Sequence, residues 1–205
     1  MDGSEIHEAV LTLLAIDRAG AEAVCLAPNI KQFHVINHLT GEESKGEARN
    51  VLTESARIAR GKIRDVASAK PGDLDALIFP GGFGAAKNLS DYAFKSADCA
   101  INPDVARLAR EIHAAGKPIG VICIAPMLAA RLFGTEHPQL TIGSDRNSAK
   151  DIEKMGGQHV NCAAQDVVID KERKLLSTPA YMLARSIKEA AEGIEKLVGA
   201  VLELA

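Results

Sequence analysis

The spacing of apolar side chains at the start of the chain is typical of a helix. From residue 4 to residue 18 they fall on one face of a helical wheel: Ile6, Val10, Leu13, Leu14 and Ala15. Gly20 follows as a helix stop. The pattern therefore predicts an amphipathic helix over residues 4–18.

The rest of the chain alternates between helical spacing and short apolar runs. Helical spacing predicts helices at 49–60, 105–115, 126–133 and 185–204, and one more between 142 and 159. The short runs predict strands at 23–27, 75–79, 118–122, 140–142, 159–162, 167–170 and 175–178.

This alternation defines the expected fold class. Several of the strands are apolar throughout, which favours a mostly parallel sheet that helices cover on both faces. We expect an α/β, doubly wound, flavodoxin-like protein in which residues 1–205 form a single domain, because no repeat or long linker divides the chain. Such folds commonly open with a strand, whereas this chain opens on a helix.

Composition narrows the classes of partner. The formal net charge is -3 and only 3% of the 205 residues are aromatic, which disfavours binding to nucleic acid or to an anionic membrane. No apolar run is long enough to cross a bilayer, and no leader precedes the first helix. We expect a cytoplasmic protein with a small-molecule partner.

The stretch "GVICIAP" places Cys123 between a predicted strand and a predicted helix. At that position the amides of the helix N-terminus can lower the pKa of a thiol and make it nucleophilic. A buried structural thiol is the alternative, because free cysteine is often found inside proteins. The other cysteines, Cys25, Cys99 and Cys162, are far apart in the sequence and form no CxxC pair, and Cys25 in an apolar strand is expected to be structural.

Other candidate groups carry weaker signals. The loop at Gly81 and Gly82 follows a predicted strand, so it lies at the edge of the sheet where reactive groups gather, although a tight turn explains it equally well. The six histidines show no convincing metal-ligand spacing, so we expect no metal.

Several longer phrases together resemble one family. "DGSEIHEAVLTLLAIDRAG", "LDALIFPGGFGAAKNLS", "GKPIGVICIAP", "LTIGSD" and "TPAYMLA" are similar to the ElbB proteins (enhancing lycopene biosynthesis), a branch of the PfpI-type class I amidotransferase-like superfamily. The resemblance covers essentially the whole chain. It implies a flavodoxin-like fold with a nucleophile elbow, and a glyoxalase that converts glyoxal to glycolate without a cofactor.

The resemblance also assigns roles to residues. The elbow nucleophile falls on Cys123, and the carboxyl group that contacts its sulfur falls on Glu8. The backbone amides that face a developing oxyanion fall on Gly81, Gly82 and Ile124. From its position alone, Glu8 could equally cap the first helix or face solvent.

Two departures from the superfamily bear on the reaction. No His-X-Glu follows Cys123, which disfavours glutamine hydrolysis, and Gly143 stands where many relatives carry a histidine. In addition, ElbB-like chains carry a strand before the position of Asp2 and Gly3. Our hypothesis is that the natural gene product is longer, which an intact mass equal to that of 205 residues would refute.

The sequence therefore predicts a cofactor-free glyoxalase, a lyase acting on small dicarbonyls. The alternative is a non-catalytic redox-sensing or regulatory protein, linked to isoprenoid metabolism, that uses a reactive elbow cysteine. The resemblance further implies a homodimer, for which the first and last helices could supply the surface.

Overall fold

Helices and strands alternate along the computed structural model, which describes residues 1–205. The strands are β1 (Cys25–Ala27), β2 (Ile63–Asp65), β3 (Leu77–Phe79), β4 (Ile119–Ile122), β5 (Gln139–Leu140), β6 (Gln158–His159), β7 (Val168–Asp170) and β8 (Leu175–Thr178). The helices are α1 (Ile6–Arg18), α2 (Val51–Ile58), α3 (Phe83–Lys87), α4 (Tyr92–Lys95), α5 (Pro103–Ala114), α6 (Pro126–Phe133), α7 (Arg146–Lys154) and α8 (Ile187–Leu204).

Every helix and strand predicted from the sequence is present, with ends that differ by a few residues. The sequence analysis missed β2, α3 and α4. These elements have three to five residues, which is too short for a hydrophobic period to be recognised. The α/β class is therefore confirmed.

The strands form three sheets rather than the one doubly wound sheet that we expected. The central sheet has the order β3-β4-β8-β7, while β1-β2 and β5-β6 form two-stranded sheets. All pairs are parallel except β7 with β8. No backbone ladder joins β5 to the central sheet, and side chains make the connection instead. The Thr141 amide donates to Ser177 Oγ at 2.9 Å, and the Gln139 amide donates to Asp170 Oδ2 at 3.0 Å.

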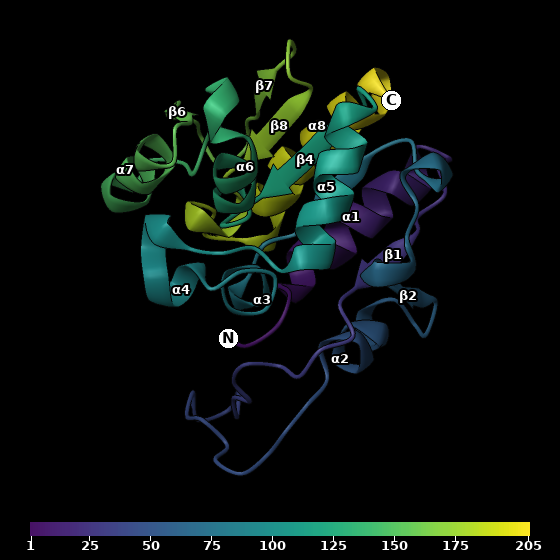
Figure 1. The fold of residues 1–205 in the computed structure, drawn as a ribbon, viewed down its shortest axis with the longest axis vertical. Coiled ribbons are helices and arrows are strands. Elements are labelled where there is room, and N and C mark those ends of the chain that lie inside the picture. The colour runs from purple at the N-terminus through teal and green to yellow at the C-terminus, as the bar shows by residue number, and fades with distance from the viewer.

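Helices cover both faces of the central sheet (Figure 1). The long helix α8 packs on β4 and β8 and against α1, whereas α5 and α6 pack on the other face of β4. Each face buries its own apolar core. None of the helices has the length and apolar character needed to cross a membrane.

The face of α1 that is buried differs from the one that the apolar spacing suggested. Ile6, Val10 and Leu14 are exposed, at 60%, 46% and 39%. The helix instead buries small or polar side chains, including Ala9, Thr12, Ala15 and Glu8. Small side chains allow α1 to approach α8 closely, and the larger apolar side chains of α1 remain unpaired within this chain.

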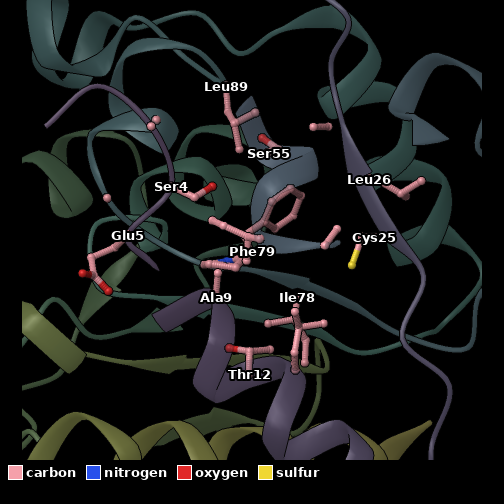
Figure 2. A pocket seen from close by; sticks show the side chains of 18 of the residues that line it. Ser4, Glu5, Ala9, Thr12, Cys25, Leu26, Ser55, Ile78, Phe79 and Leu89 are labelled. Carbon is pink, nitrogen blue, oxygen red and sulfur yellow. The ribbon is translucent and has the colours of Figure 1, made fainter. Parts of the chain in front are cut away.

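A large cavity lies between β1 and β3, which do not pair with each other. Its volume is about 1500 Å³ and its lining is mostly apolar. Figure 2 shows Cys25 and Leu26 of β1 at the right, Ile78 and Phe79 of β3 near the centre, and Ala9 of α1 to the left of them. Each of the two strands therefore leaves one edge without a backbone ladder.

Two glycines of α8 make a matched test of how closely this helix packs. A Cβ at Gly193 would collide with the carbonyl oxygen of Ala164 and lie 2.7 Å from Thr178 Oγ1, whereas a Cβ at Gly199 would meet nothing within 4 Å. We expect Gly193→Ala to lower the free energy of unfolding by about 1–3 kcal/mol. Gly199→Ala should raise it by about 0.5–1 kcal/mol, because glycine is costly inside a helix.

Denaturant unfolding of both variants measures this difference. Equal effects of the two substitutions would contradict the packing of α8.

Candidate active site

Cys123 lies at a sharp turn between β4 and α6. Its φ is +61°, a left-handed conformation that is strained for a residue other than glycine. The turn is held because the amide of Cys123 donates to the carbonyl of Thr178 at 2.9 Å, and Pro126 starts α6 three residues later. This is the geometry of a nucleophile elbow, with a cysteine that is only 7% exposed.

Glu8 is a fully buried carboxyl group in the first turn of α1. Its Oε2 accepts from the amide of Gly81 at 2.9 Å, and its Oε1 accepts from the amide of Tyr181 at 3.3 Å. The carboxyl group also hydrogen-bonds the side chain of Cys123. Three segments distant in the sequence therefore converge on one carboxyl group.

The loop after β3 lies directly against this pair. A Cβ at Gly81 would come within 2.5 Å of Cys123 Cβ and 2.7 Å of Glu8 Oε2, so only glycine fits there. The amides of Gly82 and Ile124 face the sulfur of Cys123. The amide of Gly81 is bonded to Glu8 instead, so in this structure it is not directed at an oxyanion beside the sulfur.

Burial dominates the electrostatics of the pair. It raises the pKa of Glu8 from 4.5 to about 7, against the hydrogen bonds from Cys123, Tyr181 and Gly81, which lower it. Burial also raises the pKa of the Cys123 thiol, and the Glu8 carboxylate raises it further. Two negative charges are thus disfavoured here, so at neutral pH the thiol of Cys123 keeps its proton while Glu8 titrates.

Such a pair can combine nucleophilic and acid–base chemistry. Transfer of the thiol proton to an ionised Glu8 creates a thiolate that faces the amides of Gly82 and Ile124. A carboxyl group with a pKa near neutral can then donate that proton and take another at little cost. The residues suit addition to a small carbonyl compound followed by proton transfer.

No histidine contacts this pair. Gly143 has a φ of +84°, and a Cβ there would lie 2.7 Å from Leu183, so the position has no room for a larger side chain in this structure. His7 lies at the rim with its side chain 48% exposed, and its Nδ1 is 2.8 Å from the hydroxyl of Tyr181. Glu8 is therefore the acid–base group nearest to the sulfur.

Sequence analysis missed the contribution of two residues. Tyr181, within the phrase "TPAYMLA", supplies the second amide to Glu8, and its position follows the left-handed Ala180 at φ +40°. Glu5 caps α1, because its Oε2 accepts from the amide of Glu8 at 2.7 Å. The spacing of Glu5 and Glu8 is that of a helix cap and could have indicated this contact.

No group of three or more histidine, cysteine, aspartate or glutamate side chains is arranged to hold a metal ion. The polar part of the site thus consists of one thiol, one carboxyl group and backbone amides.

A parallel α/β sheet with a strained cysteine at a strand-to-helix turn defines the class I glutamine amidotransferase-like proteins, also called the DJ-1/PfpI superfamily. A search against family models finds no match. Comparison with individual proteins is more informative.

The chain is 46% identical over 213 residues to "Glutamine amidotransferase-like class 1 domain-containing protein 3, mitochondrial" from Homo sapiens, an alignment that covers 99% of this chain and 78% of that protein. It is 43% identical to "ES1 protein homolog, mitochondrial" from Rattus norvegicus, over 99% of this chain and 79% of that one. Both names place those relatives in mitochondria.

The crystal structure of an isoprenoid biosynthesis protein with an amidotransferase-like domain from Ehrlichia chaffeensis superimposes with a TM-score of 0.91 at 38% identity, covering 100% of this chain and 94% of that one. The chain belongs to the ES1/ElbB-like family of the DJ-1/PfpI superfamily. The expected resemblance is thus confirmed.

A more distant structure shows the same fold. Glyoxalase III from Candida albicans superimposes with a TM-score of 0.59 at 13% identity, covering 97% of this chain and 88% of that chain. The two chains share a fold.

The raised pKa of Glu8 predicts a pH dependence of stability. The pKa of Glu8 is about 7 in the folded state, whereas its ordinary value is 4.5. Protonation of this carboxyl group at low pH therefore stabilises the native state. As the pH rises from below 4.5 through 7, the free energy of unfolding should fall by about 3 kcal/mol. Denaturant unfolding at pH 5 and pH 8 measures the change.

Glu8→Gln removes the titrating group and keeps a polar side chain, so it is the matched control. The free energy of unfolding of this variant should fall less over the same pH range. If the free energies of unfolding of the two proteins fall equally with pH, the raised pKa of the buried Glu8 carboxyl group is wrong.

Proposed function

We propose that the protein is a cofactor-independent glyoxalase that converts glyoxal to glycolate. The observation that carries the proposal is the buried Glu8, whose pKa is about 7 and whose carboxyl group contacts Cys123. A reaction that moves a proton between two carbons next to a thiol needs such a group. The fold shared with glyoxalase III from Candida albicans supports the proposal at the level of fold alone.

In the first step the Cys123 thiolate adds to one aldehyde carbon of glyoxal and forms a carbon–sulfur bond. The carbonyl electron pair moves to oxygen, beside the amides of Gly82 and Ile124, which face the sulfur. Glu8 gives its proton to that oxygen and becomes a carboxylate. The product of this step is a hemithioacetal.

In the second step the Glu8 carboxylate removes the proton on the carbon that carries sulfur. The electron pair forms a carbon–carbon double bond and moves the neighbouring carbonyl pair onto its oxygen, which gives an enediolate. Glu8 returns its proton to the second carbon, and the hydroxyl proton of the first carbon passes to the oxygen of the second. The first carbon is oxidised to a thioester and the second is reduced to an alcohol, so no external oxidant is needed. Water hydrolyses the thioester and releases glycolate together with the thiol of Cys123.

Two substitutions test this assignment. Cys123→Ser should abolish glyoxal consumption, because the alcohol is a far weaker nucleophile at neutral pH. Glu8→Gln should lower kcat by about 10²–10⁴-fold, the usual contribution of an acid–base group. Glycolate formation followed by NMR measures both effects, and Cys162→Ser, which removes a thiol outside the site, is the control.

A redox-sensing protein is the second candidate, and the absence of a side-chain base at Gly143 favours it. Titration of the protein with peroxide distinguishes the two functions. Rapid sulfenate formation at Cys123 without glycolate production would select the sensor over the enzyme.

We also propose that the protein is a homodimer that uses the exposed apolar side chains of α1. Ile6, Val10 and Leu14 lie on one stripe of that helix and find no partner in this chain. Val10→Glu should convert the dimer to a monomer, because a charge would be buried in the interface. Light scattering measures the mass, and Leu39→Glu, at a loop residue that is 95% exposed, should leave it unchanged.

A further inference from the structure

Glu5 is an acidic side chain that lies against the segments of the candidate active site, one turn of helix before Glu8. Its amide donates to the carbonyl of Gly81 at 3.1 Å, and its Oε2 accepts from the amide of Glu8 at 2.7 Å. A Cβ at Gly82 would collide with the amide of Glu5, so the residue lies directly against the loop beside the sulfur. Glu5 is fixed by contacts at both its backbone and its side chain.

The charge of Glu5 reaches the groups that surround Cys123. It raises the pKa of Glu8, after the larger contributions of burial and of the hydrogen bonds with Cys123 and Tyr181, and burial followed by Glu5 raises the pKa of Tyr181. Figure 2 shows Glu5 at the end of the cavity away from Cys25, and the residues that line the cavity include Cys123 and Ile124 together with Glu5. A ligand of Cys123 therefore approaches a negative charge.

Lysine and arginine do not line the cavity within the active-site segments, and Lys87 instead lies over the ring of Phe83 and donates to the carbonyl of Met1. The lining residues from 1–9, 80–84, 123–124 and 181–182 include neither lysine nor arginine. The arginines of the lining, Arg49 and Arg57, come from α2 and the residues before it. His7 Nδ1 is 4.0 Å from Glu5 Oε1, but the same nitrogen lies 2.8 Å from the hydroxyl of Tyr181.

We propose that Glu5 makes the Cys123 site selective for uncharged carbonyl compounds and against compounds that carry a carboxylate. Two like charges several ångströms apart at the edge of a protein repel each other enough to change binding by about tenfold. Glyoxal is uncharged and is not affected, whereas α-oxo acids of similar size are repelled. Glu5 is a specificity-determining residue, because it acts through its charge on the approach of the ligand.

The same charge assists release of the product. This consequence rests on the proposed function, because glyoxal enters the site without charge and glycolate leaves it as an anion. Repulsion by Glu5 weakens the binding of glycolate relative to glyoxal. Inhibition by glycolate is accordingly weak in the native protein and becomes about tenfold stronger in Glu5→Gln.

Alkylation of Cys123 tests the selectivity without reference to catalysis. Iodoacetamide and iodoacetate have nearly the same size, and in both the thiolate displaces iodide, but only iodoacetate is an anion. The rates for Cys123 are measured at pH 8 by mass spectrometry of the peptide that contains it. Their ratio, iodoacetamide over iodoacetate, should fall about tenfold in Glu5→Gln, and in the native protein it should fall as salt is added.

Two variants control for charge and for structure. Glu22→Gln removes the same charge from an exposed residue of the cavity lining and should leave the ratio unchanged. Glu5→Asp keeps the charge and should keep the ratio near the native value. An unchanged ratio in Glu5→Gln, or an equal loss in Glu5→Asp, overturns the proposal.

The outcome is distinguishable from failure of the proposed function. If the native protein discriminates between the two reagents but does not consume glyoxal, the charge selectivity is supported and the glyoxalase assignment is wrong. If the native protein consumes glyoxal but the ratio is unchanged in Glu5→Gln, the glyoxalase assignment is supported and the proposed role of Glu5 is wrong.

Discussion

The burial of one carboxyl group organises this active site. Glu8 is fully buried, and burying a carboxyl group is costly unless its oxygens are hydrogen-bonded. The amides of Gly81 and Tyr181 satisfy them, and Cys123 lies against the same group. These contacts tie α1 to the loops after β3, β4 and β8, so the requirement to satisfy one side chain fixes four segments around the sulfur.

The same burial sets the chemistry. In water a glutamate is ionised and a cysteine is protonated at neutral pH. Here both pKa values are raised, so the thiol keeps its proton and Glu8, which would be ionised in water, titrates near neutral pH. The backbone amides beside the sulfur favour the thiolate, and Glu5 adds a negative charge at the entrance. The site therefore brings together a thiol, a carboxyl group and a further negative charge without a histidine.

The predicted fold and the observed one differ for identifiable reasons. Helices with a clear period, such as those at α5 and α8, were located correctly because the period extends over three or more turns. The pattern of α1 was misleading, because Ile6, Val10 and Leu14 indicate one face while the helix buries Ala9, Thr12 and Glu8. The division into three sheets depends on which edges pair, and no local pattern specifies this.

The sequence by itself determined the α/β class and the family, and it placed Cys123 between a strand and a helix, because each of these depends on local order along the chain. Only the tertiary structure decided that Glu8 is buried, that the amide of Gly81 is bonded to it, and that Tyr181 completes its hydrogen bonds. The pKa of Glu8 depends on water excluded by residues far away in the sequence. Burial is a property of the assembled fold, and no residue carries it alone.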